Sequence, residues 1–336
     1  MTEELIAAEL AGGGGTYLDH AGATPAPRSL LQAAFADLLA RQGDGNPHSQ
    51  SAYASVIDTG RACVLSLFDA SPDDYDVVFT SGATASLKLV AEQFAFGSDG
   101  CLLYPASVHT SVLGMRALAP RSQSFPSSAL YAISPLGDSP ALDAALAASA
   151  STSSFGAASV SDSMSDSAPP LPISPSPSPS PSSSSSPGGG NVLLVVPGEC
   201  NFSGAKCNLE AVARWAHNTH AQTRARANAD AGAGASAGAN AGAGAGAPGG
   251  GGVYWLLDAA KLAATSPLSL GSLAPPLRPH FVAVSFYKIF GYPTGLGALL
   301  VHRSVSGPAA FAAASASASA SASASASTWA WLCRGG

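Results

Sequence analysis

The chain has 336 residues, 46% of them apolar, and a formal net charge of −6, which is enough for one large or two modest domains with a core. The basic residues form no stripe along the sequence, so we do not expect a nucleic acid partner. No apolar run is long enough to span a bilayer, and the acidic start (Thr2-Glu3-Glu4) has no basic targeting region, so we do not expect a membrane partner. The five cysteines include no C-x-x-C pair, which favours reduced thiols and a cytoplasmic protein over a disulfide framework or a metal site.

Two amphipathic helices are expected first, because apolar residues recur at helical spacing over residues 28–39 and again over 51–68. A strand over 76–80 then leads through Ser81-Gly82-Ala83-Thr84 into a third helix. Such a small-residue turn is suited to a phosphate, since backbone N–H groups and the helix dipole face the anion. On its own it is more often an ordinary connection with a capping hydroxyl.

Three low-complexity tracts interrupt the chain, and their Ser, Pro, Ala and Gly residues bury too little apolar area to offset the entropy of ordering. We therefore expect the first part of a domain over 1–141, a Ser/Pro-rich disordered insertion over 142–190, a continuation of the domain over 191–220, an Ala/Gly-rich disordered insertion over 221–252, the end of the domain over 253–310 and a low-complexity tail over 311–336.

Outside these tracts, strands alternate with helices. Strands are expected over 101–104 and 192–196, a helix over 209–220, and further strands that end at Asp258 and at Lys288. The alternation predicts a mostly parallel sheet with helices on both faces. Ligands of such sheets gather at the carboxyl ends of the strands, where the turn at 81–84, Asp258 and Lys288 all fall.

Lys288 is the only charged residue between 282 and 301. Among apolar and aromatic neighbours we expect its ammonium to lose hydration, which favours the neutral amine that can attack a carbonyl. Asp258 ends the preceding predicted strand, where a carboxylate can hold a protonated pyridine nitrogen. From its own stretch alone, Lys288 is equally well explained as a strand-ending residue with its ammonium in solvent.

Five separate motifs follow one another along the chain: Tyr17 to Ala23, Gly45 to Ser49, Phe79 to Thr84, Cys200 to Gly204 and Ser285 to Gly291. In these motifs and in their order the chain resembles the class V aminotransferase and cysteine desulfurase group of pyridoxal phosphate enzymes, and within it the molybdenum cofactor sulfurase family. The resemblance covers about residues 15–120 and 191–303, and it implies the large domain of a fold type I pyridoxal phosphate enzyme, with the small domain largely missing.

The resemblance also implies a cofactor, pyridoxal 5'-phosphate, and the residues of its site. Lys288 and His109 are implied as the catalytic pair. Cofactor contacts are implied for Gly82, Ala83, Thr84, His109, Asn201, Asp258, Ser285 and Lys288, and a substrate pocket for His20, Gly22 and Ala23. Without the resemblance, His109 is an ordinary helix cap, Asn201 a turn residue, and the opening motif an edge strand and turn.

The activity implied is that of an L-cysteine desulfurase acting as a sulfurtransferase, with L-cysteine as substrate. Molybdenum cofactor is implied as the eventual sulfur acceptor, in the sulfurated form used by xanthine dehydrogenase and aldehyde oxidase. The resemblance also implies that the enzyme works as a homodimer. Two alternatives stay open. One is a generic class V aminotransferase or lyase. The other is a cofactor-binding but catalytically incomplete fragment, because the family's substrate-carboxylate arginine and sulfur-accepting cysteine follow well after the Lys288 stretch, where this chain turns into Ala/Ser repeats.

Overall fold

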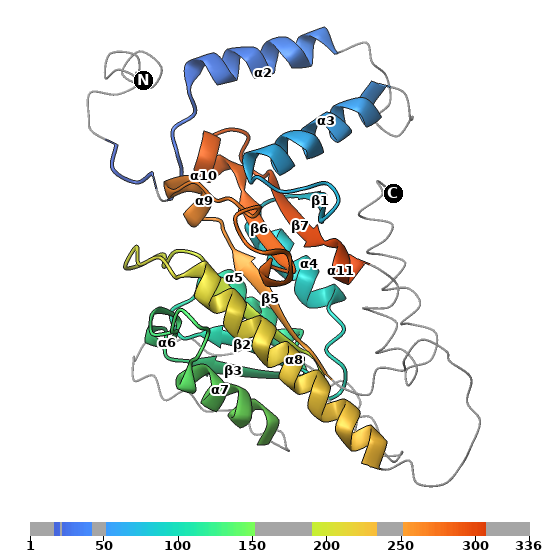
Figure 1. The fold of residues 1–336 in the computed structure, drawn as a ribbon. Helices are drawn as coiled ribbons and strands as arrows, with labels where there is room; N and C mark the ends of the chain where they lie inside the picture. Colours follow the sequence, from blue (N-terminus) through green and yellow to red (C-terminus); the bar gives the residue numbers. More distant parts are fainter. Residues whose placement is uncertain (1–16, 21, 42–51, 152–189, 234–250, 307–336) are drawn as a thin grey trace, which may run out of the picture.

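The computed structural model describes residues 17–20, 22–41, 52–151, 190–233 and 251–306, which form one sheet with helices on both faces (Figure 1). Its seven strands lie in the order β1-β7-β6-β5-β4-β2-β3. Neighbouring strands from β6 to β3 run parallel, whereas β7 runs antiparallel to both β6 and β1. The prediction of a mostly parallel α/β sheet is therefore confirmed, with one reversed strand.

The described elements follow the predicted alternation of strand and helix. The strands are β1 Tyr75–Thr80, β2 Cys101–Pro105, β3 Arg121–Phe125, β4 Val192–Pro197, β5 Val253–Asp258, β6 Phe281–Ser285 and β7 Gly297–His302. The helices are α2 Arg28–Ala40, α3 Ala52–Leu67, α4 Ala83–Gln93, α5 Thr110–Gly114, α6 Ser128–Tyr131, α7 Pro140–Ser151, α8 Leu209–Ala233, α9 Leu262–Thr265, α10 Phe286–Phe290 and α11 Arg303–Ser306, with 3-10 turns at Met115–Ala117 and Pro275–Leu277.

Both faces of the sheet are buried, which explains why its strands are unbroken apolar runs. In β4, Leu194 and Val196 belong to the core shared with α7 and α8, and Leu193 and Val195 belong to the core shared with α4 and α5. All four side chains are fully buried, and burial of each stabilises the fold by about 1.5–3 kcal/mol. Because helices pack on both faces of the sheet, they hold the strands in place, and with them the residues at the ends of the strands.

The residues predicted to carry chemistry follow strands that point the same way. The turn after β1, the segments after β2 and β4, Asp258 at the end of β5 and the helix after β6 all lie at one edge of the sheet, because these strands run in the same direction. This is the carboxyl edge, where parallel sheets hold their ligands.

Helical order extends further than predicted. Helix α7 occupies the first part of the tract assigned to residues 142–190, and α8 runs to Ala233 rather than ending at residue 220. Alanine, the best helix former, dominates both extensions, so the tracts continue helices that packing has already started. The rest of each tract, and the predicted tail, lie outside the described residues. Every helix in the described ranges, including α8, is too short or too polar to cross a membrane.

Lys288 does not end a strand. Strand β6 stops at Ser285, and Lys288 lies within the short helix α10, which ends at Gly291 with a left-handed backbone (φ 76°). Glycine adopts that conformation without steric cost, so it ends the helix directly after Phe290. The lysine is thereby held one turn beyond the sheet edge instead of in its plane.

Candidate active site

A cavity of about 50 Å³ lies at the carboxyl edge of the sheet. Seven of the eight residues predicted to contact a cofactor line it, and the eighth, Gly82, immediately precedes Ala83. The complete lining is Ala83, Thr84, Leu87, His109, Ser111, Asn201, Asp258, Ala260, Ser285, Tyr287 and Lys288. The structure thus brings together side chains from the ends of β1, β2, β4, β5 and β6.

Gly82 and Ser285 hold the start of α4. Gly82 precedes the helix with φ 128°, a conformation that favours glycine, and the Ser285 hydroxyl accepts a hydrogen bond from the Ala83 backbone N–H at 2.9 Å. Ser285 is buried. Its hydroxyl therefore positions the turn by occupying one of the exposed N–H groups at the helix start.

His109 caps α5, as a histidine at the start of a helix commonly does. Its Nδ1 accepts from the Ser111 backbone N–H at 3.2 Å and lies 2.8 Å from the Ser111 hydroxyl. That hydroxyl lies 2.7 Å from the Thr84 hydroxyl. The three side chains form a hydrogen-bonded row that joins the starts of α4 and α5. Sequence reasoning missed Ser111, whose only signal is its place two residues after the capping histidine.

The Asp258 carboxyl accepts a hydrogen bond from the Ala260 backbone N–H at 3.1 Å. Burial raises the pKa of Asp258, while that hydrogen bond and the charges of Lys288 and His109 act in the opposite direction. A desolvated carboxylate that gains from nearby positive charge is suited to bind a protonated ring nitrogen.

The opening segment of the chain packs on the helix that carries Lys288. The Thr24 hydroxyl donates to the Lys288 carbonyl at 2.6 Å, and the Thr24 N–H donates to the Tyr287 carbonyl at 3.3 Å. A side chain at Gly291 would overlap Thr24 O and Ala26 N, so glycine is also required there for close approach. Lys288 itself is half-buried.

His20, Gly22 and Ala23, the predicted substrate pocket, are not among the residues that line the cavity in the described part of the chain. His20 and Gly22 are exposed, and the His20 ring packs edge-on against Tyr17 with 5.0 Å between ring centroids. The Tyr17 hydroxyl donates to the Ala23 carbonyl at 2.7 Å. Their role in substrate binding stays a prediction.

Asn201 lies in the loop that follows β4, next to Cys200. Burial opposes ionisation of the Cys200 thiol, but hydrogen bonds from Ser203, the Phe202 backbone and Ser107 outweigh it and lower its pKa to about 7. A thiol with such a pKa is substantially ionised at neutral pH, and the thiolate is the reactive form. Cys200 is buried.

The donor set at this edge fits pyridoxal phosphate. The amine of Lys288, the carboxylate of Asp258 and the imidazole of His109 line the same cavity. The start of α4 lies beside them with the hydroxyls of Thr84 and Ser111, and this arrangement suits a phosphate. The free volume of about 50 Å³ is below the roughly 300–1,000 Å³ of ordinary small-molecule sites, so a bound ring requires side chains to move outward. His109 is exposed and half-buried Lys288 is a long side chain, so both have room to do so.

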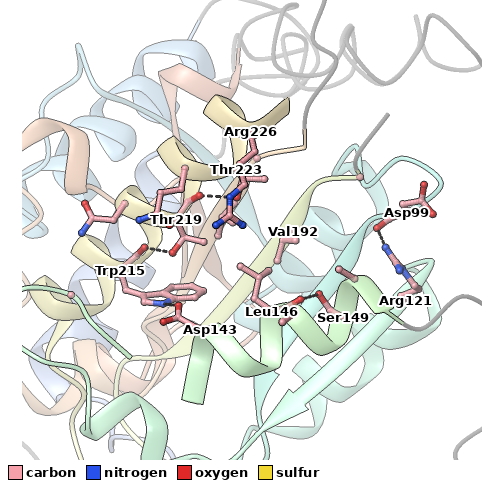
Figure 2. A pocket seen from close by; sticks show the side chains of 18 of the residues that line it. Asp99, Arg121, Asp143, Leu146, Ser149, Val192, Trp215, Thr219, Thr223 and Arg226 are labelled. Carbon is pink, nitrogen blue, oxygen red and sulfur yellow. Dashed lines mark hydrogen bonds between the residues drawn. The ribbon is translucent and has the colours of Figure 1, made fainter. Parts of the chain in front are cut away.

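A larger cavity, about 690 Å³, lies between α7 and α8 at the opposite edge of the sheet, where β3, β4 and β5 begin (Figure 2). Its polar groups are partly paired with the protein: Trp215 Nε1 donates to Asp143 at 2.9 Å, and Arg121 binds the Asp99 carbonyl. None of the predicted site residues lines it. Among the described residues, no cluster of three or more His, Cys, Asp or Glu side chains suits a metal ion.

Comparisons with known proteins agree with the fold and the motifs. Residues 16–123 match the family model "Aminotransferase class-V". The chain is 36% identical over 291 residues to the molybdenum cofactor sulfurase of Anopheles gambiae, covering 85% of this chain and 29% of that protein. It is 34% identical over 297 residues to the one of Arabidopsis thaliana, covering 87% and 31%. The chain thus spans about a third of the length of these relatives.

Solved structures show the same fold at low identity. A C-DES mutant with glycine covalently linked to its PLP cofactor superposes with a TM-score of 0.54 at 16% identity, covering 89% of this chain and 60% of that one. The complex of the cystine C-S lyase C-DES with its reaction product cysteine persulfide superposes with a TM-score of 0.53 at 16% identity, covering 90% and 59%.

Proposed function

Because the chain is a homologue of the molybdenum cofactor sulfurases over 85% of its length, with a class V aminotransferase segment, we propose that it is a pyridoxal phosphate-dependent enzyme of the L-cysteine desulfurase type. The observation that carries the proposal is the cavity at the carboxyl edge, where Lys288, Asp258 and His109 meet the start of α4. Each comes from the end of a different strand, so their convergence is a property of the fold.

In the proposed site, each residue binds one part of the cofactor. The Lys288 amine would hold its aldehyde group. The Asp258 carboxylate pairs with the ring nitrogen and keeps it protonated. The start of α4, with the hydroxyls of Thr84 and Ser111, binds the phosphate. When bound, the cofactor accepts electrons released from the substrate's α-carbon.

His109 is proposed as a proton carrier together with Lys288. The Ser111 N–H donates to His109 Nδ1, so Nδ1 is the unprotonated atom of the neutral ring and Nε2 carries the hydrogen. Nε2 is therefore the atom that exchanges a proton with substrate. The amine of Lys288, which lines the same cavity, would be the second base in reach.

The proposed reaction converts L-cysteine and an acceptor thiolate to L-alanine and a persulfide. The bond between the β-carbon and the sulfur of cysteine breaks, and its electron pair stays with the carbon, which takes up one proton. The sulfur forms a sulfur–sulfur bond with the acceptor thiolate, so no external oxidant or reductant is needed. In the complete reaction, the sulfur passes on to molybdenum cofactor. The names of the relatives support this acceptor. The first step is supported by the fold shared with a cystine C-S lyase whose reaction product is cysteine persulfide.

A homodimer and a reducing compartment such as the cytoplasm are part of the proposal. Helix α2 has no buried residue and exposes Phe35, Leu38 and Leu39, and apolar patches of this kind mark interfaces. Light scattering on the purified protein tests the dimer. The described cysteines Cys63, Cys101, Cys200 and Cys207 are free thiols, which suits a reducing environment.

The proposal is tested by titrating the purified chain with pyridoxal phosphate beside Lys288→Ala, before and after addition of L-cysteine. We expect a visible absorption band in the parent that is absent from the variant, and release of alanine with cysteine. Release of a keto acid with amino-group transfer would instead support a generic aminotransferase. A band without any turnover would support a cofactor-binding, catalytically incomplete chain, and no band in the parent would overturn the proposal.

A further inference from the structure

Glu199 and Lys261 form an ion pair, and neither residue lines the cavity. Their side chains are only 5% and 11% exposed, and Lys261 Nζ lies 3.4 Å from Glu199 Oε1. The other oxygen of Glu199 accepts a hydrogen bond from Thr265 and lies 3.8 Å from Lys206 Nζ. Glu199 follows β4, and Lys261 immediately precedes α9.

The Lys261 ammonium also binds the backbone of the loop over residues 200–204, called here the Asn201 loop. Lys261 Nζ donates to the Cys200 carbonyl at 2.9 Å and to the Asn201 carbonyl at 3.2 Å. Lys261 follows Asp258 by three residues, and Asp258 is paired in register with Pro197 at the ends of the neighbouring strands β5 and β4. One side chain therefore connects the two walls of the cavity that carry Asp258 and Asn201.

Packing does little to order the tip of this loop, residues 201–203. Asn201 and Ser203 are exposed, and Phe202, its large apolar residue, is 98% exposed. A buried ion pair is a weak source of net stability, because the cost of removing both charges from water is comparable with the attraction between them. The ammonium of this pair donates hydrogen bonds to two carbonyls of the loop. The effect of the pair is therefore to select one conformation of the loop.

We propose that the Glu199–Lys261 pair is a positioning device that fixes Asn201 against the bound cofactor and sets its distance from Asp258. The inference rests on the proposed function, because it assigns Asn201 a contact with the cofactor. Lys261 and Glu199 act through Asn201 and touch neither cofactor nor substrate. Displacement of a positioned group by about 1 Å costs on the order of 100-fold in rate, so loss of the pair has a measurable effect on the site.

The test compares Lys261→Met, which keeps most of the side-chain stem, with Asn201→Ala and with the double variant. We expect each single variant to weaken binding of pyridoxal phosphate by about tenfold or more, and the double variant to be no weaker than the worse single one, because the two residues act as one unit. Lys206→Met is the matched control, since Lys206 is half-exposed and 3.8 Å from the same carboxylate. We expect it to bind like the parent.

A second readout needs no cofactor. In the cofactor-free protein, the amides of Cys200 and Gly204 are bonded within the loop at 2.8 and 3.0 Å, and we expect Lys261→Met to speed their hydrogen exchange while the amides of β4 keep their protection. Lys261→Arg retains the charge and is expected to restore slow exchange. If Lys261→Met fails to fold, Glu199→Gln serves in both measurements.

The inference is overturned if the binding losses of Lys261→Met and Asn201→Ala add in the double variant, or if exchange in the loop is unchanged. It is also overturned if Lys261→Met only lowers the unfolding temperature while its folded form binds like the parent. Failure of the proposed function looks different, because the parent and Lys288→Ala would then bind pyridoxal phosphate equally. The loop exchange measurement still tests the positioning of Asn201 in that case.

Discussion

A single methyl group at Gly297 is predicted to strain the turn that begins α4. Gly297 is the first residue of β7 and is paired with Thr80 of β1 and Ser285 of β6. A Cβ at this position would overlap the Val284 carbonyl oxygen and lie 2.6 Å from Gly82 Cα. Both obstacles are backbone atoms, so no side-chain rotation relieves the overlap. Gly297→Ala must therefore push β7 away from the turn.

Overpacking of this kind costs about 1–3 kcal/mol. In a domain of this size, each kcal/mol lowers the unfolding temperature by about 2–4 °C, so we expect a fall of about 2–12 °C. A displaced Gly82 also strains the bond between the Ala83 N–H and the Ser285 hydroxyl, which measures 2.9 Å in the parent. The start of α4 would then be less well positioned for an anion.

The assay is urea unfolding followed by the fluorescence of the buried Trp215 and Trp255. We expect a lower midpoint with an unchanged slope, because the surface exposed on unfolding stays the same. Gly114→Ala is the control: a Cβ there meets nothing within 4 Å, and the backbone is helical with φ −62°. If Gly297→Ala is as stable as Gly114→Ala, the close packing of β7 on the turn does not exist.

Three further predictions concern charge and hydrogen bonding. Burial, then the charges of neighbouring histidines, lowers the pKa of His280 to about 3. Since the unfolded value is about 6.5, the free energy of unfolding falls as pH drops below 6.5, by about 3 kcal/mol at pH 4.5 from this residue. In His280→Gln, the urea midpoint should change less between pH 7 and 4.5 than it does in the parent. The same pH dependence in both proteins would contradict this. Asp258→Asn should weaken pyridoxal phosphate binding at least about tenfold without loss of stability in urea, since burial already disfavours the carboxylate; destabilisation with normal binding would contradict its role. Ser111→Ala should weaken binding of pyridoxal phosphate by about 10–100-fold, the value of a hydrogen bond to a charged group, and leave binding of pyridoxal unchanged; an equal loss for both ligands would refute a phosphate contact.

Regular elements were predictable where the pattern is local. The apolar run of β4 was placed within one residue, and helices α2 and α3 were found from helical spacing alone. The predicted end of α8, residue 220, is wrong by thirteen residues, because the helix continues to Ala233. Low-complexity composition predicts disorder here, but alanine-rich sequence that follows a packed helix prolongs the helix instead.

The candidate site was predictable only in part. Lys288 and Asp258 were found because each is an isolated charge in or after an apolar run, but the helical position of Lys288 depends on Gly291 and on contact with Thr24. Ser111 and Lys261 carry no comparable signal. Their roles arise from neighbours distant in sequence, Thr84 for the one and the Asn201 loop for the other, and only the order of strands in the sheet brings these together.

The most direct measurement is the position of covalent attachment. The chain has four lysines, Lys88, Lys206, Lys261 and Lys288. After incubation with one equivalent of pyridoxal phosphate and reduction with borohydride, peptide mass spectrometry locates the modified residue. We expect modification of Lys288 alone, because Lys261 is protected by its buried ion pair with Glu199. Modification spread over the exposed lysines, or centred on Lys261, would contradict it.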